Sequence, residues 1–322
     1  MSDSSRIFPL LRLLADGEFR GGAALAGALG VSLSSVRACV SAVEQLGLAV
    51  QEIPGRGYRL GEALDLLDGE QLRQATQGAL AVEILDECAS TNSVLLERAR
   101  NGASHGLVLA CERQTAGRGR RGKRWRSGIG TDLTFSVLWR FSRSAAALAG
   151  LSLVVGVALV RALARCGHAG VQLKWPNDLM LSGRKLGGVL IEVTGGHGEP
   201  SAAVIGIGLN VRWNAQRAAG VDQPATGLFG HGGSALSRSA LLAALLLDIH
   251  AALEQFTRSG FAPFRGEWLG YHAWQGRQVR LQVAGSDVAE GEAVGVAEDG
   301  ALLLRSAHGV KGFHSGELRL AV

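Results

Sequence analysis

The 322-residue sequence has few cysteines and lacks the motifs of several common catalytic sites. Its four cysteines are widely spaced and form no Cys-x-x-Cys pair. This argues against a disulfide framework or a zinc site and favours a reducing compartment. The sequence has no Gly-Lys-Ser/Thr phosphate loop, no His-Glu-x-x-His pair and no Gly-x-Ser-x-Gly elbow. The chemistry must therefore come from residues in another arrangement.

The chain also lacks a long uninterrupted apolar run. Met1–Leu10 does not contain the apolar core of a signal peptide. The most apolar stretches, Ala145–Leu163 and Ala240–Leu253, are interrupted by glycine, serine or charged residues. They predict buried helices and not membrane spans. We therefore expect a cytoplasmic protein with no membrane partner.

Glycine and positive charge, by contrast, are plentiful. The 46 glycines are about twice the ordinary share of roughly 7%, so tight turns and loops that approach a ligand closely are expected. The net charge of +5 suits an anionic partner, and both a nucleotide and DNA would serve. The length predicts two or three domains.

Both features meet in residues 114–126, where six cations fall within nine residues and alternate with glycine. Such a loop would not nucleate a core, but it could close over an anion, because guanidinium groups bind carboxylate and phosphate through two hydrogen bonds at once. A solvated basic loop or a non-specific nucleic-acid patch is the alternative.

The N-terminal segment has the pattern of a helix-turn-helix followed by a hairpin. Short helices are expected over Phe8–Leu14 and Gly22–Leu29, and Gly30 then allows a tight turn. Ser32 can cap a third helix that runs to about Leu46. Residues 48–60 form strand, glycine turn and strand, which is typical of a wing.

A winged helix-turn-helix would place the third helix in the major groove of DNA and the wing on the backbone. The side chains expected to contact DNA are Ser32, Ser34, Ser35, Arg37 and Arg56. A small helical domain used for protein contacts is the alternative. Residues 61–78 are interpreted as a connection.

Between residues 79 and 270, predicted strands and helices alternate, which favours a mixed α/β domain. One long helix is expected over Ala145–Cys166, and Ser90-Thr91-Asn92 is expected to cap a helix that starts at Ser93. Four polar constellations lie beside the apolar strands: Ser90-Thr91-Asn92, the basic loop, Lys174–Asp178 and Lys185. From residue 271 onward, five short alternating strands predict a small SH3-like β-barrel.

Taken in order, the motifs resemble those of the bacterial biotin protein ligases. The motifs that carry the likeness are Gly117–Trp125, Lys174–Asp178, Lys185–Gly188 and Gly206–Asn210. With the N-terminal helix-turn-helix, the chain looks like the bifunctional BirA type, which is both ligase and biotin operon repressor. The resemblance spans essentially the whole chain. It implies an α+β multidomain protein, with a winged helix-turn-helix at 1–62, a class II synthetase-like α/β ligase domain at 63–270 and an SH3-like barrel at 271–322.

The resemblance also implies the activity of a biotin–[acetyl-CoA-carboxylase] ligase. Biotin's carboxylate attacks the α-phosphate of ATP in the presence of Mg²⁺, giving biotinoyl-5′-AMP and pyrophosphate. A lysine of the biotin carboxyl carrier protein of acetyl-CoA carboxylase then takes the biotin. The adenylate-bound protein would form a homodimer that binds operator DNA and represses biotin synthesis genes.

Roles for individual residues follow from the same resemblance. The catalytic residues would be Arg118, Arg120 and Lys185. Biotin would be bound by Ser90, Thr91, Asn92, Gln114, Arg118, Gly119, Arg120 and Lys185. The nucleotide would be bound by Arg120, Arg121, Trp125, Lys174, Asn177, Asp178 and Asn210. Asp178 is the candidate Mg²⁺ ligand. The segment Val211–Leu228 resembles the adenylate-covering region.

Two other functions compete with this one. The first is a transcription regulator that senses a small acid without catalysis, and the intact Lys185 and complete basic loop argue against it. The second is a lipoate- or octanoate-type ligase or transferase, which shares the core fold. Such relatives are not expected to combine the arginine–glycine loop with a helix-turn-helix.

Overall fold

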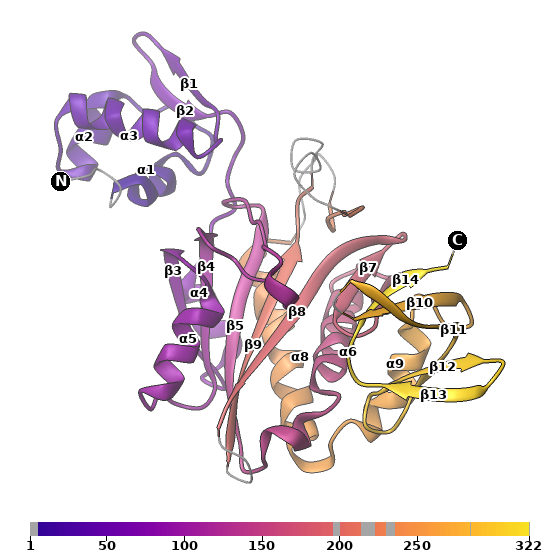
Figure 1. Cartoon of the computed structure of the whole chain (residues 1–322). Helices are drawn as coiled ribbons and strands as arrows, with labels where there is room; N and C mark the ends of the chain where they lie inside the picture. Colours follow the sequence, from indigo (N-terminus) through magenta and orange to yellow (C-terminus); the bar gives the residue numbers. More distant parts are fainter. Residues whose placement is uncertain (1–5, 196–199, 214–222, 230–235, 284, 322) are drawn as a thin grey trace. The chain divides into compact units, whose positions relative to one another are not determined.

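The chain of the computed structural model divides into two compact units (Figure 1). The N-terminal unit comprises Met1–Leu67 and Ile129–Thr131, and the larger unit comprises Asp68–Gly128 and Asp132–Val322. The structure describes residues 6–195, 200–213, 223–229, 236–283 and 285–321.

The N-terminal unit contains three helices and a two-stranded hairpin, as predicted. Its elements are α1 (Ile7–Leu14), α2 (Gly22–Leu29), α3 (Leu33–Gln45), β1 (Val50–Ile53) and β2 (Gly57–Leu60). Gly30 ends α2 in the left-handed conformation. The Ser32 hydroxyl caps α3 by accepting a hydrogen bond from the Ser35 amide at 3.2 Å. Apolar side chains from all three helices and from β2 form the core of this unit, and Ile129 packs among them.

The hairpin is held to the first helix–turn segment by backbone pairing. Arg20 and Tyr58 exchange two backbone hydrogen bonds, of 2.8 and 2.9 Å. Gly57 makes this approach possible, since a Cβ at that position would lie 2.0 Å from the Arg20 carbonyl oxygen. Its φ of +95° also favours glycine.

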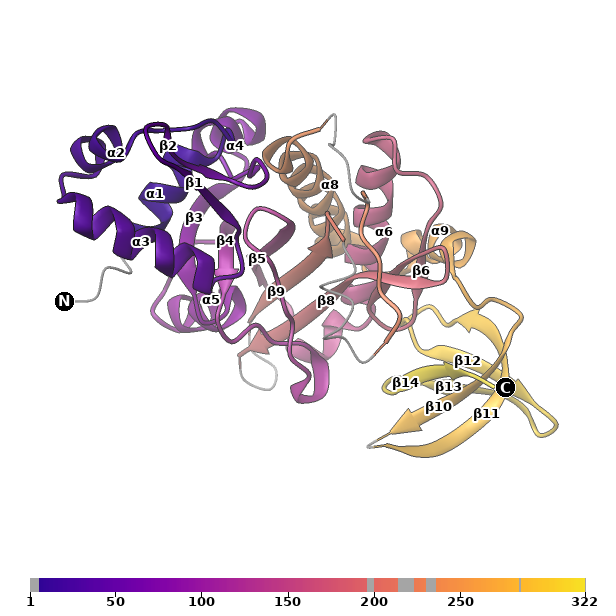
Figure 2. The same cartoon turned by 90° about the horizontal axis from the view of Figure 1, so that it is seen from above.

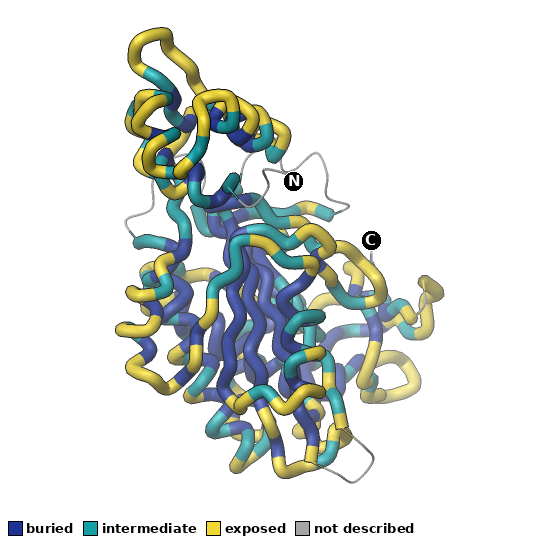
Figure 3. Tube along the Cα trace, turned by 90° about the vertical axis from the view of Figure 1, so that its left-hand side faces the viewer, coloured by how far each residue is buried: buried dark blue, intermediate teal, exposed yellow. Residues whose placement is uncertain are grey.

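A seven-stranded sheet forms the centre of the larger unit. Its strand order is β3-β4-β5-β9-β8-β7-β6. The β3–β4 pair is parallel and every other pair is antiparallel. The strands are β3 (Ala81–Cys88), β4 (Leu107–Gln114), β5 (Asp132–Phe141), β6 (Val171–Lys174), β7 (Asp178–Leu181), β8 (Arg184–Thr194) and β9 (Ser201–Asn210). The strands in the middle of the sheet are buried over most of their length (Figure 3).

Helices cover both faces of this sheet (Figure 2). On one face lies α5 (Thr91–Arg100), whose Leu95 packs with Leu109 and Leu138. On the other lie α6 (Leu151–Arg165) and α8 (Arg238–Ser259). Successive side chains of β5 point to opposite faces of the sheet, so the strand contacts both helix layers. Trp139 donates a hydrogen bond to Thr257 of α8, while Ser136 contacts α5. By length and composition, the segments Ala145–Arg165 and Arg238–Ser259 could cross a membrane, but here they pack against each other and the sheet.

Two predictions for this unit were wrong. Residues 61–78 are not only a connection, because they contain α4 (Gly69–Thr76), which begins at an Asp68 cap. The long helix expected over Ala145–Cys166 is interrupted. A 3₁₀ turn, Ala145–Leu148, precedes α6, and Gly150 between them has a φ of +79°. The side chain of Phe261 leaves no room for another side chain there, since a Cβ on residue 150 would lie 2.7 Å from Phe261 Cβ.

After η4 (Ala262–Phe264) and α9 (Arg265–Tyr271), the chain forms a five-stranded antiparallel sheet. Its order is β13-β12-β11-β10-β14. The strands are β10 (Gln278–Val283), β11 (Ser286–Val296), β12 (Leu302–Ser306), β13 (Gly309–Phe313) and β14 (Glu317–Leu320). The five strands expected from residue 271 onward are therefore present. A central α/β sheet followed by a β-rich C-terminal part is confirmed.

Candidate active site

The first polar constellation lies at the start of α5 and at the end of β4. The Thr91 amide donates to Gln114 Oε1 at 2.8 Å, so these predicted residues are adjacent. Ser90 is buried at the helix N-terminus, but its side chain makes no capping hydrogen bond. The helix also begins at Thr91 and not at Ser93, so the expectation that this triplet caps it is wrong. Its position beside Thr91 and Gln114 is consistent with a ligand contact.

The side-chain amide of Asn92 is buried and hydrogen-bonded to other groups of the protein. Only 3% of Asn92 is exposed. Its Oδ1 accepts from the Ser136 hydroxyl at 2.6 Å, and its Nδ2 donates to Leu190 O at 3.2 Å and to Glu192 Oε2 at 2.9 Å. Gly206 leaves space for this amide, because a Cβ there would lie 2.1 Å from Asn92 Oδ1. Sequence reasoning singled out neither Ser136 nor Glu192.

The arginine–glycine loop is folded back on itself like a small hairpin. The amide of Gly119 donates to Lys123 O at 2.7 Å, and that of Trp125 donates to Gly117 O at 2.9 Å. A Cβ on Gly117 would lie 2.5 Å from the Trp125 carbonyl oxygen, so the narrow base of the loop requires glycine. Arg121 at the turn has a φ of +56°. The loop thus has a defined backbone, and all its cations except Arg120 are exposed.

Trp125 seats the loop on the sheet. Its indole lies against the backbone of Gly208 on β9, where a Cβ would come within 2.4 Å of the ring. The indole Nε1 is buried and has no hydrogen-bond partner among the residues that the structure describes. A buried donor without a partner is costly. This Nε1 is therefore available to an acceptor on a ligand.

Arg120 joins the loop to the Lys174–Asp178 motif. Its Nη1 donates to Asn177 Oδ1 at 3.0 Å. Burial, and after it the charge of Arg121, lowers the pKa of Arg120 from its ordinary value, although guanidinium stays protonated at neutral pH. Asn177 is itself fixed, since its Nδ2 donates to Val189 O at 2.8 Å. Two motifs that are distant in sequence thus form one site.

Lys185 and Asp178 form an ion pair of 2.7 Å on the neighbouring strands β7 and β8, and both side chains are mostly buried. The backbone of Lys185 also pairs with the segment that follows β9. The Lys185 amide donates to Pro224 O, and the Lys185 carbonyl accepts from the Thr226 amide, both at 2.9 Å. Asn210 Nδ2 donates to Thr226 O at 3.0 Å. Part of the Val211–Leu228 segment, residues 214–222, lies outside the described residues.

The C-terminal sheet reaches the same loop. Lys123 Nζ lies 2.8 and 3.0 Å from the two carboxylate oxygens of Glu317 on β14. Arg121 donates to Gln282 O on β10 at 3.4 Å. The ammonium of Lys174 lies over the ring of Trp274, 4.4 Å from its centroid, and burial lowers the pKa of this lysine. The C-terminal strands therefore contribute to holding the cationic side of the site.

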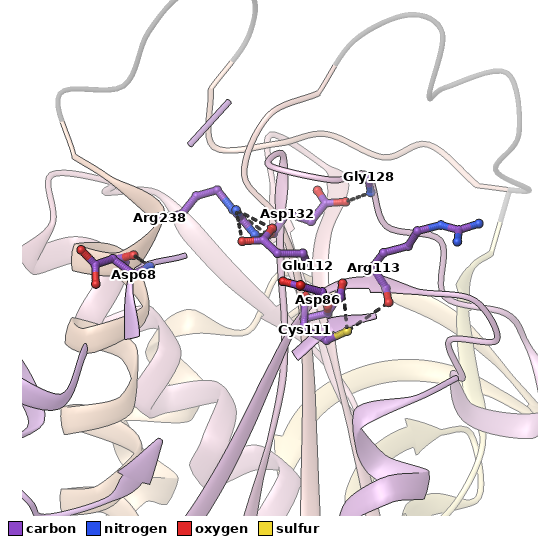
Figure 4. A network of polar contacts seen from close by, with 10 residues as sticks. Asp68, Asp86, Cys111, Glu112, Arg113, Gly128, Asp132 and Arg238 are labelled. Atoms are coloured by element: carbon purple, nitrogen blue, oxygen red, sulfur yellow. Dashed lines mark hydrogen bonds and ion pairs between the residues drawn. The ribbon is translucent and has the colours of Figure 1, made fainter. Parts of the chain in front are cut away.

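A buried ion pair fixes the strands from which the loop leaves (Figure 4). Arg238 at the start of α8 is 1% exposed. Its guanidinium lies 2.9 Å from Glu112 Oε2 on β4 and 2.5 Å from Asp132 O on β5. The Asp132 carboxylate in turn accepts from the Gly128 amide at 2.9 Å, at the far end of the loop. Sequence reasoning missed this anchor, because nothing local to Arg238 indicates that its partners are more than 100 residues away.

The residues predicted to contact DNA lie together in the N-terminal unit. Ser32, Ser34 and Ser35 surround the first turn of α3, with their hydroxyls hydrogen-bonded to one another, and Arg37 is exposed on the same helix. Arg56, in the turn between β1 and β2, stacks over Phe19 at 4.4 Å from the ring centroid.

Comparison with known families agrees with the motifs. Residues 86–210 match the Biotin/lipoate A/B protein ligase family. Residues 276–318 match the family of the biotin protein ligase C-terminal domain. The first match includes the start of α5, the arginine–glycine loop and Lys185, and the second includes Glu317 at the start of β14. The matched ranges therefore contain most of the residues that meet in the candidate site.

Relatives match along most or all of the chain. The bifunctional ligase/repressor BirA of Escherichia coli is 36% identical over 99% of this chain and 98% of its own length. The biotin–[acetyl-CoA-carboxylase] ligase of Mycobacterium tuberculosis is 34% identical over 71% of this chain and 84% of its own. A structure of the Aquifex aeolicus biotin protein ligase with biotin and ATP superposes with a TM-score of 0.64, at 30% identity, over 75% of this chain and 99% of that one. The chain therefore belongs to the family of bacterial bifunctional biotin protein ligases and biotin operon repressors.

Proposed function

We propose that this protein activates biotin with ATP to biotinoyl-5′-AMP and transfers biotin to a lysine of the biotin carboxyl carrier protein of acetyl-CoA carboxylase. The observation that carries the proposal is the meeting of three sequence-distant cationic motifs. Arg120 contacts Asn177, while Lys185 pairs with Asp178 on the next strand. The nucleophile of the first step belongs to biotin, so the protein needs no serine or cysteine nucleophile.

The cations of the site compensate the negative charge of the two reactants. A carboxylate must approach a polyphosphate, and charge develops at the α-phosphate in the transition state. We assign this compensation to Arg118, Arg120 and Lys185. Arg120 is pre-oriented by Asn177, and Lys185 is held by Asp178, so little reorganisation is needed when the substrates bind.

We assign the biotin end of the site to the floor beneath the loop. Its residues are Ser90, Thr91, Asn92, Gln114, Arg118 and Gly119. Of these, Asn92 acts through its neighbours, because its amide is fully used inside the protein. The unpartnered Trp125 Nε1 would donate to the ligand, and the loop would keep water away from the labile anhydride.

We assign the nucleotide side to Arg121, Trp125, Lys174, Asn177, Asp178 and Asn210. No group of three or more histidine, cysteine or acidic side chains suited to a metal occurs among the described residues. Mg²⁺ typically uses one or two carboxylates together with substrate phosphates, and Asp178 fits that pattern as the protein ligand. When bound, the ion would neutralise phosphate charge.

We propose that the N-terminal unit is a winged helix-turn-helix that represses biotin synthesis genes. The capped α3 would enter the major groove, and Arg37 and the hairpin residue Arg56 would contact the phosphate backbone. Binding of biotinoyl-5′-AMP would favour a homodimer that presents two such units to a palindromic operator. The domains would be 1–62, a class II synthetase-like 63–270 and an SH3-like barrel at 271–322, in a cytoplasmic protein.

Pyrophosphate release from ATP and Mg²⁺ tests the proposed activity. The purified protein is assayed with biotin, lipoate, octanoate or no acid. We expect release with biotin alone, followed by biotin transfer when the carrier protein is added. Release of pyrophosphate only with lipoate or octanoate would agree with the proposed fold but contradict biotin as the substrate. No release with any acid would favour a sensor without catalysis.

A further inference from the structure

A chain of polar groups, buried at its centre, crosses the floor of the site and reaches the loop through one carboxylate. It links Gln114, Thr91, Ser136, Asn92, Glu192 and Arg118. The Thr91 and Ser136 hydroxyls lie 2.7 Å apart, and Ser136 donates to Asn92 at 2.6 Å. Glu192 Oε2 then accepts from Asn92 at 2.9 Å and from Arg118 Nη2 at 2.5 Å. The two ends of the chain, Gln114 and Arg118, both lie on the N-terminal side of the loop.

The neighbours of Asn92 and Gln114 fix which of their atoms donate and which accept. Asn92 Nδ2 faces the carbonyl of Leu190, which can only accept, so Asn92 Oδ1 must face Ser136. The Ser136 hydroxyl also faces Thr91 Oγ1, and the Thr91 hydroxyl donates to Gln114 Oε1 at 3.2 Å. Gln114 Oε1 is fixed as an acceptor by the Thr91 amide. At the other end of the chain, Asn92 therefore presents its Nδ2 as a donor to Glu192.

We propose that Glu192 is a positioning residue that ties the arginine–glycine loop to the buried floor of the biotin site. The inference rests on the proposed function for its consequence in biotin binding. Two donors, Asn92 Nδ2 and Arg118 Nη2, converge on the same oxygen of Glu192, and the charge of the carboxylate strengthens both hydrogen bonds. Thr91, Asn92 and Ser136 are at most 3% exposed, so water does not replace a lost partner there.

The test compares Glu192→Gln, which keeps the shape and removes the charge, with Glu192→Asp. Glu83→Gln is the matched control. Glu83 lies on β3 of the same sheet and forms an ion pair of 2.6 Å with Arg98 of α5, away from the loop. The first readout is trypsin cleavage after the cations of residues 118–126 without any ligand. The second is biotin affinity by calorimetry in the absence of ATP.

We expect Glu192→Gln to be cleaved about tenfold faster in the loop and to bind biotin about tenfold more weakly, as the loss of one charge-assisted hydrogen bond implies. Glu192→Asp should recover part of both effects, and Glu83→Gln should match the wild type. Adding Glu192→Gln to Arg118→Gln should change neither readout further. Values for Glu192→Gln equal to those of Glu83→Gln would overturn the proposal, as would faster cleavage with unchanged biotin affinity. Absence of biotin binding by the wild type would instead contradict the proposed function, while the cleavage comparison would still test Glu192.

Discussion

At the scale of single residues, we propose that the pair Lys185–Asp178 prepares the site for an anion. Both side chains are mostly buried and lie 2.7 Å apart. Removing the lysine would leave a carboxylate facing the incoming phosphates. We expect Lys185→Ala to lower kcat for biotin-dependent pyrophosphate release by about 10²–10³-fold, as for loss of other electrostatic stabilisers. Lys311→Ala on β13 is the control. Unchanged release in Lys185→Ala would remove this lysine from the site.

Gly208 has a role that a single methyl group can test. Trp125 lies so close to the β9 backbone that a Cβ at residue 208 would come within 2.4 Å of its ring. We expect Gly208→Ala to displace the indole and to weaken biotin binding at least tenfold while leaving the sheet folded. Gly312→Ala is the control, because it is also in a strand but its Cβ would meet nothing nearer than 3.7 Å. Biotin affinity and near-ultraviolet circular dichroism measure the two effects. Equal affinities for the two variants would show that Trp125 does not need this contact.

At the scale of elements, the sequence was informative wherever periodicity and capping agreed. The helix expected over Gly22–Leu29 has those bounds, and α3 begins after its Ser32 cap as predicted. The helix α4 was missed because its sequence is mostly polar. Its buried Leu72 and the hydrogen bond from the Asp68 amide to Ser239 of α8 stabilise it through tertiary contacts. Local pattern does not encode such contacts.

The candidate site divides in the same way. Residue type and glycine spacing were enough to select the arginine–glycine loop and Lys185. Ser136 and Glu192 lie inside regular strands and have no local signature, and their partners on α5 are more than 40 residues away. Nor does the sequence give the reason for Gly206 and Gly208. That reason is the space needed by Asn92 and Trp125, and it emerges only when β9 is placed beneath them.

The contact between the loop and the β-rich C-terminal part predicts a pH dependence. The hydrogen bond from Lys123 lowers the pKa of Glu317 below its ordinary 4.5. A carboxyl whose pKa is lower in the folded state stabilises the protein at a pH above its unfolded-state pKa. This stabilisation is lost as the pH falls through its folded-state pKa. Glu317→Gln should therefore be less stable than the wild type at pH 6–8, and this difference should shrink below about pH 4.5. Urea unfolding at several pH values measures it.

The partner substitution Lys123→Gln provides the control for that experiment. It should reproduce both the loss at neutral pH and its disappearance in acid, because it removes the same interaction. Since Lys123 is largely exposed, the effect should be small and should decrease with added salt. A stability difference for Glu317→Gln that is the same at pH 4 and pH 7 would contradict the assignment to this ion pair.

At the scale of the whole molecule, the proposal places the two functions in different units of one chain, so a substitution in one unit should separate them. Arg37 is exposed on the capped helix α3, far in sequence from the catalytic motifs. We expect Arg37→Ala to keep biotin-dependent pyrophosphate release and carrier biotinylation at wild-type rates. Binding to a duplex selected by the wild-type protein with biotin and ATP should weaken about tenfold, and the slope of log affinity against log salt should fall by about 1, as for one lost phosphate contact.

Arg258→Ala, on the exposed side of α8, serves as the control for loss of a positive charge. If Arg37→Ala bound this duplex as tightly as Arg258→Ala, α3 would not be the recognition helix. If the wild type selected no duplex, the chain would be a ligase that has kept the helix-turn-helix without an operator.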